Sequence, residues 1–432
     1  MRLGLIELIL VVAIAALVLG PSVVFWVLRW MHRAEIANRA AARRRAEIQA
    51  QIRAERDAVL HRFQIVGFAL AVLMVLSLLY ALLLRPIDPR PQSYSAPAVR
   101  TEEAARSAAD TEERLLDGFS DPACVRVREG WVYLAVRSED TGGSAILRMR
   151  EDGSSLSKIV ELEGEITDFD FDPEGEIWLT LLTRSGGMLC RASYDGWGAS
   201  TEQVVTQIDG QPLPCPAAVA VGADGRVYFA NLSRAEAENG LDAALRTELL
   251  AHTATGQVYV YDPAARTVET VVSGLAGASG LAYLPEENAL YISELGQRCV
   301  WKVDADVRDR TAGGRGSVLF AGELPGYPAA LALDEDGDVW IGYRWNRSSW
   351  LEAQSAEEFQ RGVALRLPGR MQQGIFGTGE GTPAADCYTA EGVLALTALA
   401  ADGQGTTALA PTGSRLYLGT SGSPAALRWL LY

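Results

Sequence analysis

The sequence predicts an all-β six-bladed β-propeller, preceded by an α-helical membrane segment with two transmembrane helices. Three observations support this fold class. A short hairpin motif recurs six times between residues 118 and 432, two apolar runs of spanning length occupy the first 90 residues, and a basic segment separates those two runs. A chain of 432 residues has room for one large domain and an additional membrane segment.

The recurring motif is an acidic or small residue, then Gly or a substitute, one free position, an aliphatic residue and an aromatic residue. It predicts a strand, a tight turn and a second strand, because Gly accepts the positive φ that such turns need. Successive copies start 45 to 77 residues apart, a spacing typical of propeller blades, some of which carry insertions. The copies are Glu129–Tyr133, Glu174–Trp178, Asp224–Tyr228, Glu287–Tyr291, Asp336–Trp340 and Gly413–Tyr417.

Two insertions are predicted within the propeller, both of them helical. Residues 234–252 and 350–363 combine apolar and charged side chains at helical spacing and are expected to cover one opening of the propeller. The aromatic side chains Trp131, Trp178 and Trp340 are expected to pack within or between blades, because large aromatics bury much area.

The first 90 residues read as a membrane hairpin. Transmembrane helices are predicted at about 3–28 and 64–84, with a basic helical loop at 29–62 that contains nine Arg and four acidic residues. The positive-inside rule places this loop in the cytoplasm and residues 91–432 outside it. Retention of the first run is the preferred interpretation, and its removal as a signal peptide is the alternative.

Charge is distributed unevenly along the chain. Residues 1–90 hold twelve Arg and six acidic residues, a net of +6, so the remainder carries −21 of the total of −15. An acidic main domain argues against nucleic acid as a partner. Residues 91–117 read as a linker with a stiff Pro-rich start, and Ala- and Glu-rich residues 101–116 predict one short helix before the propeller begins at 118.

Four segments between residues 255 and 328 carry a family resemblance: Thr255–Pro263, Gly274–Leu281, Arg298–Lys302 and Leu324–Pro328. In order and spacing they resemble the strictosidine synthase-like proteins, which belong with gluconolactonases, regucalcin and paraoxonases. The resemblance implies a six-bladed propeller around a central divalent cation, often calcium, held by carboxylates and amides at the starts of the innermost strands. Some of these relatives are membrane-anchored, with the propeller outside the cytoplasm.

At the positions that match the family's cation ligands, most of the oxygen-bearing side chains are replaced. The matching positions are Ala123, Ala217, Ala218, Ser279, Ala329 and Ala330, where relatives have Glu, Asn or Asp. A neutral hydroxyl is a poor calcium ligand, and Asp168 is the one carboxylate expected nearby. We therefore expect no metal and no other cofactor, with calcium only if a hydrolytic site has been rebuilt.

Other candidate catalytic groups are few, and no catalytic residue is assigned. His252 is the only His of the propeller region and is expected at the surface beside an insertion. Cys124 and Cys215 flank inner-strand starts, where they are expected either as small buried hydrophobes or facing the channel. The five Cys include no Cys-x-x-Cys pair, which argues against a structural zinc site.

Two classes of function follow from these observations. The preferred one is a non-catalytic binding or assembly module with a degenerate metal site, in a plasma or inner membrane, whose partners are the lipid bilayer and another membrane or extracytoplasmic protein. The alternative is a lactonase- or arylesterase-type hydrolase with a rebuilt active site. Because a fold does not fix a function, the loss of ligands at the site carries more weight than the resemblance.

Overall fold

The computed structural model describes residues 20, 61, 63–101, 106–108, 112–194, 198–377, 383–399, 405–413, 415–420 and 425–431. The chain divides into two units, Met1–Pro86 and Ile87–Tyr432. The first predicted span, apart from Gly20, and the basic loop, apart from His61, lie outside the described residues.

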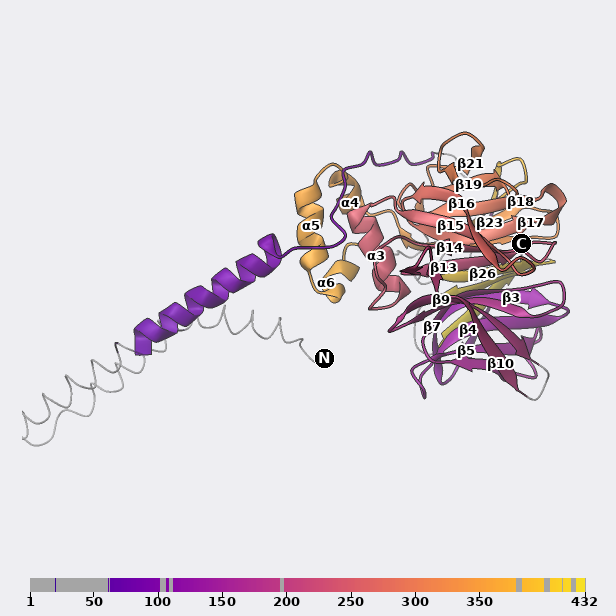
Figure 1. Ribbon diagram of the computed structural model, residues 1–432, viewed down its shortest axis with the longest axis horizontal. Coiled ribbons are helices and arrows are strands. Elements are labelled where there is room, and N and C mark those ends of the chain that lie inside the picture. The colour runs from indigo at the N-terminus through magenta and orange to yellow at the C-terminus, as the bar shows by residue number, and fades with distance from the viewer. Residues whose placement is uncertain are drawn as a thin grey trace, which may run out of the picture. The chain divides into compact units, whose positions relative to one another are not determined.

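The first unit contributes one long apolar helix, Phe63–Leu84, drawn in indigo in Figure 1. Its last turn, η2 (Tyr80–Leu84), is a π-helix, and Arg85 caps it by donating its backbone N–H to the carbonyl of Tyr80. Among the described residues it is the one helix long and apolar enough to cross a membrane. It coincides with the second span predicted from the sequence, at 64–84.

The second unit is a six-bladed β-propeller, as predicted, in which each blade has four antiparallel strands and blades 3 and 5 each add a short parallel strand at the edge. Blade 1 contains β3 (Phe119–Arg128), β4 (Trp131–Ser138), β5 (Ser144–Arg150) and β6 (Ser157–Leu162). Blade 2 contains β7 (Glu165–Phe171), β8 (Ile177–Thr183), β9 (Gly186–Tyr194) and β10 (Ala199–Val205). Blade 3 contains β13 (Pro216–Val221), β14 (Val227–Asn231), β15 (Gly256–Asp262), β16 (Thr267–Leu275) and the short β20 (Arg310–Thr311).

The remaining three blades follow in chain order, and a short hairpin lies between blades 2 and 3. Blade 4 contains β17 (Ala278–Leu284), β18 (Ala289–Glu294), β19 (Cys299–Asp304) and β21 (Ser317–Ala321). Blade 5 contains β22 (Gly326–Leu333), β23 (Val339–Asn346), β24 (Pro383–Tyr388), β25 (Leu394–Leu399) and β1 (Arg106–Ala108). Blade 6 contains β26 (Thr406–Thr412), β27 (Arg415–Thr420), β28 (Ala425–Leu431) and β2 (Glu112–Leu116), and the hairpin is β11 (Gln207–Ile208) with β12 (Gln211–Pro212).

The strands β1 and β2 precede the first blade in the chain but belong to the last two blades, and β2 closes the ring. β2 pairs antiparallel with β28, so blade 6 combines strands from both ends of the propeller, and β1 lies parallel to β25 at the edge of blade 5. The short helix predicted at 101–116 is therefore wrong. Ala- and Glu-rich composition favours a helix locally, but the unpaired edges of β25 and β28 supply hydrogen-bond partners that override this preference.

In blades 2 and 5 the turn between the first two strands explains why an aromatic residue recurs on the second strand. In blade 2 the Asp172 carboxylate accepts the Glu176 N–H (2.8 Å) and the indole N–H of Trp178 (3.1 Å). In blade 5 Asp334 holds the Asp338 N–H and the Trp340 indole in the same way, at 2.9 and 3.1 Å. Both Trp rings are buried as predicted, whereas Trp131 is half-buried.

Hydrophobic clusters of the described residues fill the spaces between the blades. Six of them each join two neighbouring blades around the ring. A seventh lies between the propeller and a group of helices. This distribution is expected when every blade has two buried faces.

Helices α3 (Leu241–Ala251), α4 (Ser349–Ala353), α5 (Glu358–Arg366) and α6 (Gly369–Gln373) form a cap on one side of the propeller, as Figure 1 shows. The helix α3 lies within the predicted insertion 234–252, and α4 and α5 confirm the helical character of 350–363, whereas α5 continues to Arg366 and α6 lies beyond that range. α3 begins after Gly240, whose φ of 86° favours glycine. Ser348 caps α4 by accepting the Leu351 N–H.

Candidate functional site

The central channel is lined by residues at a β-bulge that recurs at the start of every innermost strand. In β7, β13, β17, β22 and β26 the pairing register shifts by one residue around a single unpaired position. In β3 the same irregularity spans residues 121–123. In chain order the bulge residues are Ala123, Thr167, Ala217, Ser279, Ala329 and Thr407, and all of them line one cavity. Bulges re-aim side chains, and here they turn six of them toward the channel.

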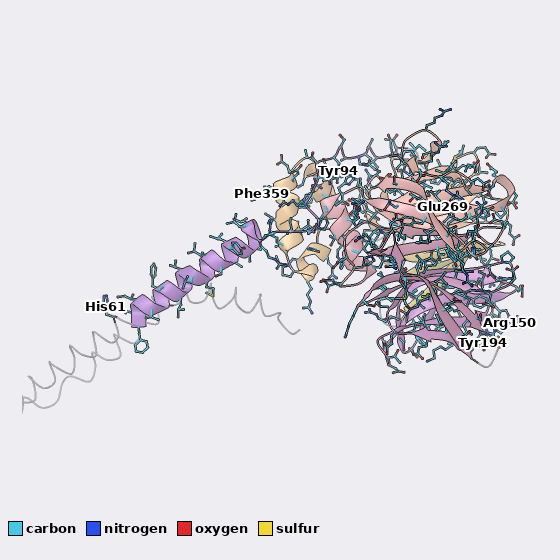
Figure 2. The ribbon with its side chains drawn as sticks, in the orientation of Figure 1. His61, Tyr94, Arg150, Tyr194, Glu269 and Phe359 are labelled. Carbon is cyan, nitrogen blue, oxygen red and sulfur yellow. The ribbon has the colours of Figure 1, made fainter. Side chains whose placement is uncertain are left out.

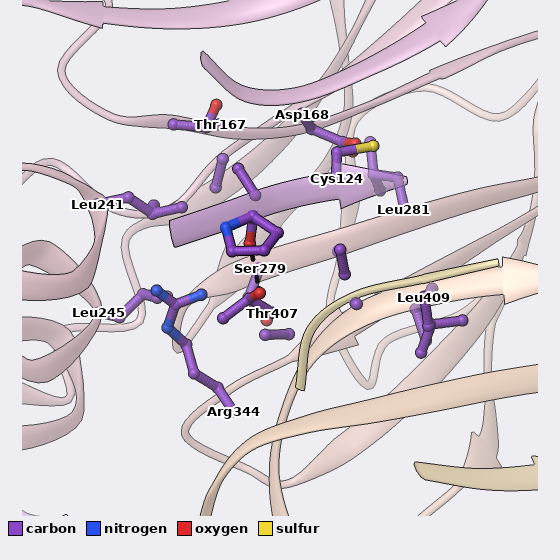
Figure 3. Close-up of a pocket in the computed structure, with 18 of the residues that line it drawn as sticks. Cys124, Thr167, Asp168, Leu241, Leu245, Ser279, Leu281, Arg344, Thr407 and Leu409 are labelled. Atoms are coloured by element: carbon purple, nitrogen blue, oxygen red, sulfur yellow. Dashed lines mark hydrogen bonds between the residues drawn. The ribbon is translucent and has the colours of Figure 1, made fainter. Parts of the chain in front are cut away.

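Small apolar and hydroxyl side chains alternate around this ring. Blades 1, 3 and 5 present Ala123, Ala217 and Ala329, each directly after a Pro, and blades 2, 4 and 6 present Thr or Ser. The Thr167 hydroxyl donates to the Pro216 carbonyl (2.9 Å) and the Ser279 hydroxyl to the Pro328 carbonyl (2.8 Å). The Thr407 hydroxyl donates to the Pro122 carbonyl. Each hydroxyl thus joins its blade to the next one, and we call these three contacts the channel latches. Figure 3 shows the side chains of Thr167, Ser279 and Thr407 around the channel.

The carboxylate of Asp168 is engaged by protein donors. One oxygen accepts the Phe169 N–H (2.9 Å) and a guanidinium N–H of Arg126 (3.0 Å), and the other accepts the Val219 N–H (3.0 Å). Asp170 repeats the pattern by accepting the Val221 N–H at 2.9 Å. These carboxylates attach blade 2 to blade 3. Burial raises the pKa of the Asp170 carboxyl, although Arg126 opposes that shift.

Helix α3 covers one end of the channel. Leu241 and Leu245 line the cavity, and Arg344 beside them donates to Asp242 at 2.6 Å (Figure 3). Glu165 accepts the Leu241 N–H at 3.1 Å and so caps the first turn of α3. The solvent space left in the channel is about 60 Å³, room for a few water molecules.

The donor set of the channel does not fit calcium. A calcium ion takes about six to eight oxygen ligands, several of them charged. Among the described lining residues three bulge positions are Ala, and the three hydroxyls already donate to carbonyls. Both oxygens of Asp168 accept protein N–H groups, and Arg126 adds a positive charge at the same point. Asp121 and Glu165 also line the cavity, but Glu165 accepts the Leu241 N–H, and the guanidinium groups of Arg126 and Arg344 line the same space. The carboxylates are therefore offset by cationic groups, and the cost of dehydrating a divalent cation is not met.

The structure brings together most of the positions selected from the sequence. Ala123, Ala217, Ser279, Ala329 and Ala330 line the channel with Asp168, whereas Ala218 is buried in the core between blades 3 and 4. Cys124 lines the channel and is buried, and burial raises the pKa of its thiol well above the ordinary value. Cys215 is buried under the cap.

His252 lies in the cap, away from the channel, and the expectation that it is exposed is wrong. The side chain is buried, and its ring stacks on Tyr94 with centroids 3.7 Å apart. Burial lowers the pKa of the imidazole to about 4. The sequence around His252 does not indicate this burial, because the Tyr94 ring that stacks on it lies 158 positions earlier in the chain.

Sequence reasoning missed the latch residues Thr167 and Thr407 and the charged residues Arg126, Glu165 and Arg344. A signal existed for the latches. Thr167, Ser279 and Thr407 begin alternate inner strands at the position that Pro-Ala pairs occupy in the other three. The charged residues carry no comparable motif, because their roles depend on partners in other blades.

Two further spaces and one acidic cluster lie outside the channel. A vestibule of about 420 Å³ beside α3 is lined by Arg137, Asp121 and Gln373, and a rim pocket of about 760 Å³ lies between blades 2 and 3. Ligand atoms of Asp334, Asp338 and Cys387 lie within 4.8 Å of one another. Asp334 is engaged as a turn residue, and burial raises the pKa of the Cys387 thiol to about 12, so it is protonated at neutral pH.

The fold and the channel together define a six-bladed β-propeller with latched, small side chains at its centre. Residues 152–354 match the SMP-30/gluconolactonase/LRE-like region, so this part of the chain is similar to that family. The resemblance inferred from the sequence is confirmed at this level.

Individual relatives agree with the family match. The chain is 23% identical to protein strictosidine synthase-like 13 of Arabidopsis thaliana over 172 residues, 40% of each protein. It is 26% identical to strictosidine synthase-like 6 of the same plant over 224 residues, 52% of this chain and 53% of the relative. The chain thus spans about half the length, or less, of these relatives. A gluconolactonase from Xanthomonas campestris has the same fold, with a TM-score of 0.52 at 19% identity over 81% of this chain and 100% of that one.

Proposed function

We propose that this chain is a membrane-anchored, extracytoplasmic propeller that acts as a non-catalytic binding or assembly module for another membrane or extracytoplasmic protein. The observation that carries the proposal is the ring of bulge residues. Its three Ala side chains offer no oxygen, and its three hydroxyls donate to carbonyls of the neighbouring blade. The centre of the propeller is therefore suited to holding blades together.

The alternative, hydrolysis of an ester or lactone, would require a group that polarises the carbonyl and a group that activates water. The donor set of the channel does not fit the cation that would polarise the carbonyl. For the latter, His252 lies in the cap rather than the channel. The Glu165 carboxylate lines the channel, but it already accepts the Leu241 N–H at 3.1 Å as the cap of α3.

Membrane anchoring and orientation rest on the helix Phe63–Leu84 and on the Arg excess of residues 29–62. An apolar helix of 22 residues is long enough to span a bilayer. The Arg-rich segment before it favours the cytoplasmic side, which places the propeller outside. Protease added to intact spheroplasts should digest the propeller, and its protection in sealed cells would contradict this topology.

Calcium titration tests the absence of a channel site. The melting temperature of the detergent-solubilised full chain should change by less than about 1 °C between chelator and millimolar calcium, since a ligand stabilises only a site that exists. Aryl ester and lactone hydrolysis should be absent under both conditions. Ala329→Lys is the matched control, because it places an ammonium group at a bulge position.

A calcium-dependent rise of several degrees that Ala329→Lys abolishes would reveal a channel site and favour the hydrolase. The binding function itself predicts a stoichiometric protein partner that co-purifies equally well with and without chelator. Recovery of the full chain alone from its native membrane, under mild detergent, would contradict the assembly role.

A further inference from the structure

The segment 87–100 is an extended strap that is clamped onto the cap by two buried arginines. Arg361 donates to the carbonyls of Gln92, Leu250 (3.0 Å) and Ser355 (3.1 Å). Arg298 donates to Pro97 (2.7 Å) and Ala98 (3.1 Å). Both guanidinium side chains are almost fully buried, so release of the strap would remove one carbonyl acceptor from Arg361 and two from Arg298.

Further contacts hold the strap along its length. The Gln92 N–H donates to the Ala251 carbonyl at 2.8 Å, the Tyr94 N–H donates to the Ser355 carbonyl at 3.1 Å, and the Tyr94 ring stacks on His252 (Figure 2). At the far end Arg100 pairs with Asp386 at 2.7 Å in blade 5. The strap is therefore part of the folded propeller unit, and the flexible length between it and the apolar helix is short.

That length limits how far the cap can move from the end of the apolar helix. The helix ends at Leu84, and the side chain of Ile87 already lies beside Gly362 of α5, where an added Cβ would be 3.4 Å from the Ile87 terminal methyl group. Three residues span at most about 10 Å. If Leu84 lies at the hydrocarbon boundary, α5 is within the depth of the headgroup region or directly above it.

The cap exposes large apolar side chains, and one of them projects from the helix face on which the strap begins. Phe359 of α5 is 58% exposed, at the outer edge of the cap in Figure 2, and it precedes Gly362 by three residues. Residues three apart lie on one helix face, so Phe359 projects from the face on which the strap begins. Trp350 of α4 and Met371 of α6 are 38% and 52% exposed. Aromatic rings are enriched at the membrane interface, where a polar layer adjoins an apolar one.

Charges around these side chains suit a neutral, zwitterionic surface. Arg85, Arg90 and Arg370 are exposed, as are Asp88, Glu357 and Glu358. The near balance of signs gives no strong attraction to anionic lipid and no strong repulsion from it. Attachment would rest on the apolar side chains, and the arginine stems can extend along the headgroups.

We propose that the cap is a membrane-docking surface in which Phe359, with Trp350 and Met371, inserts into the lipid headgroup region beside the anchor helix. The occupant of this surface is the bilayer, and the inference rests on the anchoring proposed above. Because α3 belongs to the same cap and covers the channel, docking turns the covered end of the channel toward the lipid. The opposite face of the propeller, which carries the hairpin turns, is then the one presented to a protein partner.

The test uses the full chain in phosphatidylcholine nanodiscs with a nitroxide on Phe359→Cys. The five native cysteines are buried, so unsubstituted protein is the labelling blank. Val318→Cys is the matched control, because Val318 is also apolar and is 63% exposed, on β21 of blade 4. We expect the label at 359 to collide with oxygen several-fold more often, relative to a water-soluble nickel chelate, than the label at 318. Equal ratios at the two positions would overturn the docking surface.

A third label, on Leu76→Cys within the apolar helix, separates failure of docking from failure of anchoring. Lipid exposure at 76 with aqueous exposure at 359 would retain the anchor and refute docking. Aqueous exposure at both would refute both proposals. Burial of 359 from oxygen and nickel alike would show that a protein covers the cap, which also contradicts lipid docking.

Discussion

The carboxylate of Asp168 offers a direct way to decide whether the channel is a latched core or a cation site. Asp168→Ala leaves the buried N–H groups of Phe169 and Val219 without their acceptors, and each unsatisfied donor costs about 1–3 kcal/mol. It also removes the closer of the two partners of Arg126, since Asp170 remains at 3.7 Å. Breaking a buried charge pair costs about 3–5 kcal/mol, and we expect the whole change to fall in that range.

Urea unfolding of the full chain in detergent, followed by tryptophan fluorescence, measures this loss. In thermal unfolding the melting temperature should fall by roughly 6–10 °C, at about 2 °C per kcal/mol, which is the low end of the range for large domains. Asp336→Asn, at an exposed turn position, is the control and should stay within about 0.5 kcal/mol of the unsubstituted chain.

Calcium distinguishes the two interpretations of the result. If Asp168 only joins the blades, the loss in free energy of unfolding should be the same with chelator and with calcium, because no ion takes part. A loss that appears only in calcium would make Asp168 a metal ligand and refute the reasoning, as would an Asp168→Ala chain as stable as the Asp336→Asn control.

Three further predictions concern the latches, the bulge and the cap. Ser279→Ala removes the donor to Pro328 and should cost about 1–2 kcal/mol, whereas Ser200→Ala on an exposed strand should be neutral; equal unfolding midpoints would contradict the latch. Gly280→Ala places a Cβ 2.4 Å from the Ala329 carbonyl oxygen and should cost about 3 kcal/mol, whereas Gly369→Ala, with open space around it, should not destabilise the fold. Burial raises the pKa of Glu248 to about 7, so its stabilising contribution is complete below about pH 4.3 and is lost as the pH rises through 7. The pKa of His252 is lowered to about 4, so its contribution has the opposite sign and grows as the pH rises. In the Glu248→Gln variant the free energy of unfolding should therefore increase by about 3 kcal/mol from pH 4 to 6.5, measured by unfolding at each pH. A second substitution, His252→Gln, should remove this increase.

The number of blades could be predicted because the hairpin motif depends on contacts between residues that are close in sequence. An Asp or Gly at the turn and an aromatic residue on the second strand are fixed by neighbours within six residues, as the Asp172–Trp178 pair shows. The closing strands were not predictable, because residues 106–116 gain their hydrogen bonds from β25 and β28, whose sequences lie about 290 to 315 positions later. Composition alone favoured a helix there.

The channel shows the same division between local and distant causes. The Ala positions could be found from the family resemblance, since their Pro neighbours are retained. Thr167 and Thr407 face the channel because of the bulges, and their only sequence signal is that they occupy the position of the Pro-Ala pairs in alternate inner strands. Arg126 likewise has a role only because blade 2 brings Asp168 to it.

Closure of blade 6 by β2 also has a consequence for the timing of biosynthesis. Arg114 pairs with Leu427, 313 residues later, so the ring stays open until the last strand has left the ribosome. At about 5–20 residues per second this delay is roughly 15 seconds to a minute. During that interval the edge of β2 has no strand beside it, and its free backbone N–H and carbonyl groups can pair with foreign chains. The nascent protein should therefore depend on chaperones for most of its synthesis, and loss of only the seven-residue strand β28 should make the propeller prone to aggregation.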